Sequence, residues 1–164
     1  MTQPPITVTI QGLDKLKKVT RPELVLGPTS RAIRDLSLLA ERTSKAAAPA
    51  DTGALRRSIT AQIKPLSARI GDTRDLTYFE VQERGRRPGQ RMPPPSALAG
   101  WARRHGFGTT PGALFVLARG IARRGFRGRF FMAKGRQAVE KALPGKLRKA
   151  SKEIEKSWGQ GRIR

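Results

Sequence analysis

Few residues in this chain could perform acid–base or metal chemistry. Its 164 residues include no cysteine and a single histidine, His105. Thiol nucleophiles, disulfides and Cys-ligated zinc are therefore excluded, and a histidine-based triad or zinc site has almost no ligands to use. His105 precedes Gly106 at an expected helix end, where a cationic side chain meets the negative end of the helix dipole. We therefore expect a structural role for His105.

Carboxylates are sparse in the middle of the chain. Those between Glu41 and Glu140 are Asp51, Asp72, Asp75, Glu80 and Glu83. A two-metal nuclease needs converging carboxylates, and Glu80 and Glu83 with Asp72 are one candidate set, although each also fits a turn or the solvent face of a strand. The sequence contains no P-loop and no HExxH or GxSxG pattern. We therefore expect neither an enzyme nor a bound cofactor or metal.

Positive charge dominates the composition. The chain has 34 Lys and Arg against 12 Asp and Glu, for a formal net charge of +22. Such a surface attracts polyanions and repels copies of itself unless the charge is countered. Nucleic acid is the explanation that we favour. The alternatives are a solvated basic face typical of an arginine-rich proteome and a neutralising acidic partner subunit.

The positive charge is densest between Arg84 and Arg136, a stretch without any Asp or Glu. Arginine-rich loops bind phosphates without reading base sequence, because guanidinium groups contact the backbone oxygens. No recognition helix and no RRM-like interleaving of basic and aromatic residues is present. We therefore expect sequence-independent contact with DNA or with an acidic partner. The candidate residues are Arg84, Arg86, Arg87, Arg91, Arg103, Arg104, Arg123, Arg124, Arg127 and Arg129.

The first half of the chain must position these residues through one long helix. Residues 6–10 alternate apolar and β-branched polar side chains and predict a strand, and residues 13–19 predict a short helix. Residues 28–48 carry an apolar stripe at helical spacing, with Thr29 or Ser30 as the cap and Pro49 as the stop.

The middle third predicts an antiparallel meander of three strands. The strands are expected at residues 58–63, 68–71 and 77–82, each bounded by turn residues. Residues 55–63 also fit a helix, but the alternation from residue 58 onward favours a strand.

The second half combines an exposed loop with helices. Residues 84–95 are rich in Arg, Pro and Gly and predict a loop or arm. Helices are expected at residues 96–104, capped by Ser96, and at 113–124, with Leu114, Val116, Leu117 and Ile121 on the apolar side. Residues 127–132 are expected to be extended, and a last helix over 134–158 should kink or split at its Pro144–Gly145 pair. Trp101 fits either a core position or an interface anchor.

These elements predict one α+β domain over residues 1–158 and a flexible basic tail over 159–164. We expect a small antiparallel sheet of three to four strands, packed by the long N-terminal-half helix and the C-terminal helix. Hydrophobic residues make up only 37% of the chain, so the core should be thin and should be completed against copies or partners. No targeting segment or membrane span is evident, and we expect a soluble protein made in a cytoplasm.

Four segments form a recognisable pattern in chain order. Residues 6–16 read ITVTIQGLDKL, residues 48–59 APADTGALRRSI, residues 78–85 YFEVQERG and residues 118–131 ARGIARRGFRGRFF. The pattern resembles the tail-completion or head–tail joining (neck) proteins of tailed phages, which are related to the minor tail protein Z group of lambda-like phages. The resemblance extends over about residues 6–157.

The second segment is the most specific part of the resemblance. The family motif residues are Pro49, Asp51, Thr52, Gly53, Leu55, Ser58, Tyr78, Glu83 and Gly85. Physically, proline ends the helix, Asp51 or Thr52 caps a turn, and Gly53 permits a positive φ before the next element. The turn either fixes how the long helix lies over the sheet or is only a connection, which is the interpretation we favour.

The chain departs from the family pattern at three points. Phe79 replaces a small residue, Gly85–Arg86 replaces Gly-Thr, and no proline precedes the Phe130–Phe131 pair. These departures affect the expected loop and partner contacts more than the fold.

The resemblance implies a structural virion protein at the head–tail junction, assembled in the host cytoplasm. It implies a homo-oligomeric ring, expected to be a hexamer, between the head connector or adaptor and the tail terminator or tail tube. Double-stranded DNA would pass through the channel, and the 84–95 loop and the C-terminal helix would contact neighbouring subunits. The alternatives are a non-specific DNA-binding accessory or packaging protein and a toxin-like or nuclease enzyme.

Overall fold

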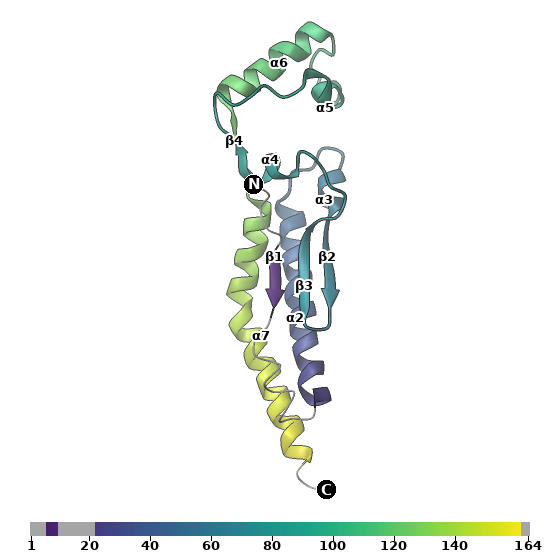
Figure 1. Ribbon diagram of the computed structural model, residues 1–164, viewed down its shortest axis with the longest axis vertical. Helices are drawn as coiled ribbons and strands as arrows, with labels where there is room; N and C mark the ends of the chain where they lie inside the picture. Colours follow the sequence, from purple (N-terminus) through teal and green to yellow (C-terminus); the bar gives the residue numbers. More distant parts are fainter. Residues whose placement is uncertain (1–5, 10–21, 162–164) are drawn as a thin grey trace.

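The computed structural model describes residues 6–9 and 22–161 of the chain, which form an elongated molecule (Figure 1). The short helix predicted over residues 13–19 and the end of the predicted tail, residues 162–164, lie outside the described residues. The fold is α+β, as the sequence predicts, with two long helices beside a small antiparallel sheet.

The two long helices, α2 (Pro22–Ala47) and α7 (Phe131–Gly161), run side by side in opposite directions (Figure 1). The predicted stripe of α2 is buried, with Ile33 and Leu36 at most 1% exposed. The helices approach closely at Gly135, where an added Cβ would lie 2.1 Å from Ser44 Oγ. Small residues at this crossing therefore set the distance between the helices.

Both long helices extend beyond their predicted bounds. α2 begins at Pro22 and not at residue 28, so Pro28 lies inside the helix. Pro22 is tolerated at the helix start, because the N–H that proline lacks would have no intrahelical partner there. The helix then continues past Pro28, where Val25 and Thr29 are buried. α7 runs unbroken across Pro144–Gly145, where a split was one expected outcome, and reaches Gly161. Packing along α2 outweighs the local helix-breaking preference.

The sheet has the strand order β1-β3-β2, all antiparallel, from β1 (Ile6–Thr9), β2 (Ile59–Lys64) and β3 (Ser67–Asp72). It packs on α2, and Ile59 and Ile70 are fully buried at this contact. The backbone N–H of Ala61, on the edge strand, donates to Glu41 Oε2 of α2 at 2.8 Å.

One of the three predicted meander strands is wrong. Residues 77–82 do not form a third meander strand, because α4 (Phe79–Arg84) occupies this segment and β1 is the third strand. The helical spacing lets Phe79 pack edge-on against Phe131, with ring centroids 5.2 Å apart, while Glu83 is buried one turn later. The strand expected at residues 58–63 is confirmed to within one residue as β2, which begins at Ile59 directly after the short helix α3 (Ala54–Ser58). Short alternating runs cannot by themselves separate a helical turn from a strand.

Residues 85–128 form a separate projection, which we call the arm; the rest of the described chain is the helical body. The arm begins and ends in a two-stranded ribbon of β4 (Gly85–Arg86) and β5 (Phe126–Arg127). Between the strands lie the 3-10 helix η1 (Pro95–Leu98), α5 (Ala99–Arg104) and α6 (Pro111–Arg124). In Figure 1, α5 and α6 lie beyond the end of the body from which the ribbon emerges.

The arm confirms the two predicted helices but not all of their details. Ser96 is not the cap, because the 3-10 turn begins after Pro94 without a side-chain cap, whereas Thr110 Oγ1 caps α6 by accepting from Ala113 N at 3.3 Å. Val116, predicted on the apolar side of α6, is 69% exposed. The predicted 84–95 loop begins with the last residue of α4 and with β4, is irregular over residues 87–94, and ends at the first residue of η1. The predicted extended segment 127–132 contains the end of β5 and the start of α7.

The hydrophobic core lies wholly in the body. Its buried members are Leu36, Ala40, Ala48, Leu55, Ile59, Ile70, Phe131, Met132 and Val139. Of the described helices, none is long and apolar enough to cross a membrane.

Candidate nucleic-acid or partner interface

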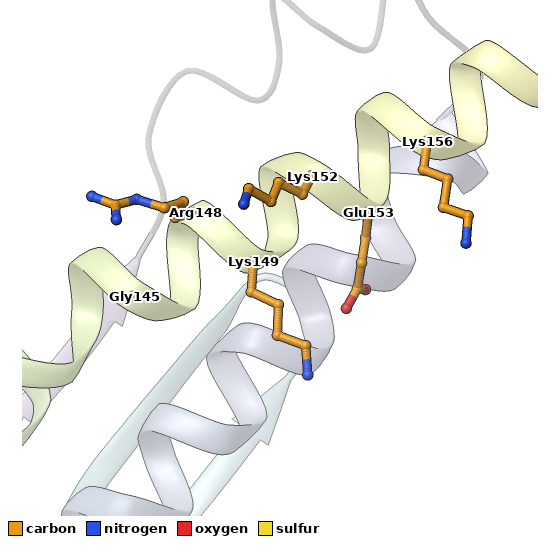
Figure 2. Close-up of a pocket in the computed structure, with 6 residues that line it drawn as sticks. All are labelled: Gly145, Arg148, Lys149, Lys152, Glu153 and Lys156. Carbon is orange, nitrogen blue, oxygen red and sulfur yellow. The ribbon is translucent and has the colours of Figure 1, made fainter.

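One basic surface lies on α7, away from the arm. Arg148, Lys149, Lys152 and Lys156 line a shallow hollow on one side of the helix, together with Glu153 (Figure 2). Glu153 Oε2 accepts from Arg31 Nη2 of α2 at 2.8 Å, and this ion pair keeps the pKa of Glu153 below its usual range. These lysines were not among the predicted contact residues, because regular Lys and Glu spacing indicates a solvated helix face.

The ten predicted contact arginines occupy several parts of the structure. Arg84 ends α4, Arg103 and Arg104 end α5, Arg91 lies in the loop after β4, and Arg129 lies between β5 and α7. The remaining five surround the place where the ribbon meets the C-terminal end of α6, and we call them the ribbon arginines: Arg86, Arg87, Arg123, Arg124 and Arg127.

Backbone contacts bring the ribbon arginines together. Ribbon pairing places Gly85 opposite Arg127 and Arg86 opposite Phe126. The N–H of Gly89 donates to the carbonyl of Ala122 at 2.8 Å, which holds the loop after β4 against the last turns of α6. The sequence predicted these arginines as candidates but gave no means of separating them from Arg103 and Arg104, on the other side of the arm.

Glycine makes the ribbon possible. Gly85 and Gly125 have φ of 79° and 63°, and a Cβ at Gly125 would lie 2.2 Å from Arg86 O. A Cβ at Gly128 would lie 2.3 Å from Glu83 O. Because no side chain fits between these backbones, glycine at these positions fixes the course of the ribbon.

Glu83 anchors the base of the arm in the body. Its side chain is fully buried, and its carboxylate accepts from Met132 N at 2.9 Å and from Ala133 N at 3.1 Å. Glu83 therefore caps the N-terminus of α7, where unpaired N–H groups favour an anion. This structural role differs from the solvent-facing or metal-binding role considered from the sequence.

The other predicted metal candidates also have local roles. The carboxylate of Asp72 accepts from Arg74 N at 2.9 Å and from Leu76 N at 2.5 Å, which shapes the turn before α4. Within the described residues, no group of three or more His, Cys, Asp or Glu side chains is arranged to hold a metal ion.

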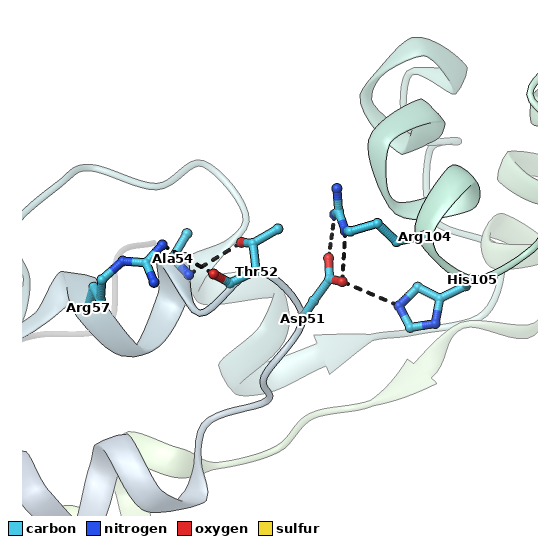
Figure 3. Close-up of polar contacts among 6 residues, drawn as sticks. All are labelled: Asp51, Thr52, Ala54, Arg57, Arg104 and His105. Carbon is cyan, nitrogen blue, oxygen red and sulfur yellow. Dashed lines mark hydrogen bonds and ion pairs between the residues drawn. The ribbon is translucent and has the colours of Figure 1, made fainter.

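The family-like turn after α2 contacts the far side of the arm through Asp51 (Figure 3). Arg104 Nε donates to Asp51 Oδ1 at 2.8 Å, and its Nη2 donates to Asp51 Oδ2. His105 Nε2 lies 3.4 Å from Oδ1. We call this three-residue contact the Asp51 latch. The hydrogen bond from Arg104 is the largest cause that holds the pKa of Asp51 below its ordinary value. The interpretation favoured from the sequence was that this turn is only a connection. The contact with Arg104 shows that the turn also joins the body to the arm.

The neighbouring motif residues shape the turn itself. Gly53 has a φ of 74°, as predicted, and Thr52 Oγ1 accepts from Ala54 N at 3.3 Å. Leu55 and Ser58 are buried on α3, which starts directly after Gly53. Pro49 follows the end of α2, Tyr78 precedes α4 and is 40% exposed, and Gly85 opens the ribbon.

Aromatic residues extend the latch into the arm. Trp101 stacks on His105 and on Phe107, with ring centroids 4.5 and 5.2 Å apart, and is 37% exposed. The sequence allowed two roles for Trp101, a core position or an interface anchor. Trp101 is not a member of the core cluster of the body. His105 lies at the C-terminal end of α5, as expected, and its backbone N–H donates to the carbonyls of Trp101 and Ala102. Phe107 and Phe115 are exposed, which the sequence analysis did not predict. The available signals for this exposure were the glycines on both sides of Phe107 and the position of Phe115 on a short helix.

Comparison of the chain with protein-family models, curated proteins and solved structures gives no match.

Proposed function

We propose that this chain is a structural subunit of the head–tail junction of a tailed double-stranded DNA phage. It assembles as a ring, expected to contain six copies, between the head connector or adaptor and the tail terminator or tail tube. DNA passes through the ring without being read for sequence. The protein acts by assembly and not by catalysis.

The observation that carries this proposal is the convergence of the family-like segments. Phe130 N donates to Glu83 O at 3.0 Å, which joins the third segment to the fourth. Leu55 and Ile59 of the second segment share one core cluster with Phe131 of the fourth. Segments far apart in sequence thus form one structural unit at the base of the arm, as expected if the pattern reflects a common architecture and not chance similarity.

Incomplete burial also supports an assembling subunit. Large hydrophobic side chains remain exposed in both regions, including Leu38 and Leu147 on the long helices and Phe115 and Val116 on the arm. A monomer with so thin a core gains from covering such side chains against copies of itself.

Electron microscopy of particles with and without the protein tests the proposal. Deleting the gene from its phage should leave filled heads and separate tails that fail to join, or tails defective at the head-proximal end. Supplying the protein in trans should restore joined virions. Normal joined virions from the deletion strain would contradict the proposal.

The second candidate is a non-specific DNA-binding accessory or packaging protein. The acid-free, arginine-rich stretch from Arg84 to Arg136 favours it. The discriminating measurement is the mass of the purified chain with and without DNA. A ring that forms in the absence of DNA favours the junction subunit, whereas a monomer that binds DNA and never assembles favours the accessory protein.

A further inference from the structure

The ribbon arginines form a concentration of positive charge that is not ion-paired within the described part of the chain. None of the ion pairs within residues 6–9 and 22–161 joins a ribbon arginine to a carboxylate. Four of the five (Arg87, Arg123, Arg124 and Arg127) are exposed. Like charges held close together repel one another, and a bound polyanion relieves this repulsion.

Arg86, the fifth, is partly buried at the ribbon. Its Nε–H is buried and has no hydrogen-bond partner among the residues that the structure describes. Buried donors normally find an acceptor, because an unpaired one costs free energy. This donor of the Arg86 guanidinium is therefore not used for a hydrogen bond within the described residues.

The ribbon presents these arginines on a fixed backbone. Gly85 and Gly125 allow the two strands to approach more closely than any side chain permits, and Glu83 fastens the base of the ribbon to α7. A site that is ordered before its ligand arrives loses less conformational entropy on binding. The backbone that carries Arg86 and Arg127 is thus positioned before a ligand binds.

The chemistry of the cluster favours phosphate over other anions. Arginine presents a planar fork of donors that pairs with two phosphate oxygens, whereas lysine acts as a point charge. The arm contains arginine and no lysine, aspartate or glutamate. The α7 hollow differs because its cations are mostly lysines and because the carboxylate of Glu153, paired with Arg31, lies among them.

We propose that the ribbon arginines bind the phosphate backbone of double-stranded DNA without reading its sequence and that they, and not the α7 hollow, are the main DNA contact of the chain. The inference deepens the proposed function and takes from it only that DNA is the polyanion present.

A pair of matched variants of the full chain tests the assignment. The arm variant carries Arg87→Gln, Arg123→Gln, Arg124→Gln and Arg127→Gln, all at exposed positions, and leaves the partly buried Arg86 unchanged. The helix variant carries Arg148→Gln, Lys149→Gln, Lys152→Gln and Lys156→Gln and removes the same charge from exposed positions on α7. Affinity for two unrelated DNA duplexes of equal length is measured by fluorescence anisotropy over a range of salt concentrations, after circular dichroism has established that both variants fold.

The salt dependence gives the expected result. Each lost phosphate contact lowers the slope of log affinity against log salt by about 0.9. The arm variant should lose roughly 3 to 4 from this slope and the helix variant less than about 1, equally for both duplexes. Between ~50 and ~200 mM salt, the wild-type affinity should therefore fall roughly a hundredfold more than that of the arm variant.

Three results would overturn the proposal. Equal losses in the two variants would indicate general attraction to net charge. A larger loss in the helix variant would assign the DNA contact to α7. An unchanged slope in the arm variant would leave the ribbon arginines free for an acidic protein partner.

A separate readout distinguishes this inference from the proposed function. Ring formation by both variants is followed by light scattering in the absence of DNA. If the slope falls as expected but no ring forms, the DNA site stands and the junction role fails. If rings form while the arm variant keeps the wild-type slope, the junction role stands and the DNA site fails.

Discussion

The body and the arm depend on different interactions for their structure. Phe131 in the body is fully buried, whereas Phe115 in the arm is 47% exposed. The buried hydrophobic residues of the arm are only Ala102, Leu114 and Ala118. Burial of large apolar side chains therefore stabilises the body, while the arm depends on a glycine-dependent ribbon at one side and the polar Asp51 latch at the other.

The two regions also differ in how their charge is balanced. On the long helices, acids lie close to bases, as in the pairs of Arg31 with Glu153 and Lys146 with Asp35. The arm has arginines and no acid of its own, and its one ion-paired arginine, among the described residues, is Arg104 with Asp51 of the body. A region with little buried apolar surface and unbalanced charge is suited to binding more than to stabilising the fold.

The largest expected effect tests the difference in burial. Phe131→Ala should lower the free energy of unfolding by about 3–5 kcal/mol, because it empties a filled core site. Phe115→Ala should change it by less than about 0.5 kcal/mol, because the ring is largely solvated. Chemical denaturation of both variants measures this. Comparable losses would mean that the arm is packed as part of the body.

A smaller effect is expected at Glu83, where the two regions join. Glu83→Gln should cost about 1–3 kcal/mol, because the amide replaces a charged acceptor of two backbone N–H groups at the start of α7. Glu140→Gln, which removes the same charge from an exposed site on α7, is the control. Hydrogen exchange of the first turn of α7 should quicken in the first variant alone. Unchanged protection there would show that the cap contributes little.

The smallest expected effect concerns the Asp51 latch, which lies at the surface. Because the chain has no cysteine, spin labels on Ala46→Cys and Thr109→Cys report one distance between body and arm. Asp51→Asn should broaden the distribution of this distance at neutral pH. Asp75→Asn, which neutralises another exposed acid, should leave it unchanged.

The same labels give the pH dependence of the latch. The folded state lowers the pKa of Asp51, so the contribution of the latch is present above the ordinary carboxyl range and is lost as the pH falls through the lowered value. The wild-type distribution should broaden below about pH 4, and also at ~1 M salt, where the Debye length is about 3 Å. Insensitivity to both conditions would mean that the latch does not hold the arm, provided that circular dichroism detects no unfolding.

Much of the local structure could be predicted from the sequence. The stripe of Ile33 and Leu36 predicted α2, the alternation of residues 6–10 predicted β1, and Gly53 was expected to adopt a positive φ. The arginines of the candidate interface were also evident from their types alone. Each of these features depends on residues within a few positions of one another.

The missed features depend on contacts between distant residues. The helical state of residues 79–84 accompanies packing of Phe79 on Phe131 and capping of α7 by Glu83. Pro28 inside α2 goes against the local preference of its residue type, and its helix is packed along α7. No periodicity within a short window carries such information.

The sequence by itself thus determined the composition of the chain, its uneven charge, its long helices and the turn after α2, because these follow from neighbouring residues. Only the tertiary structure decided that Asp51 meets Arg104, that Glu83 caps α7 and that five of the arginines gather at one ribbon. The reason is physical. Side-chain type and local spacing set charge and helix periodicity, but which distant groups become neighbours depends on how the core packs.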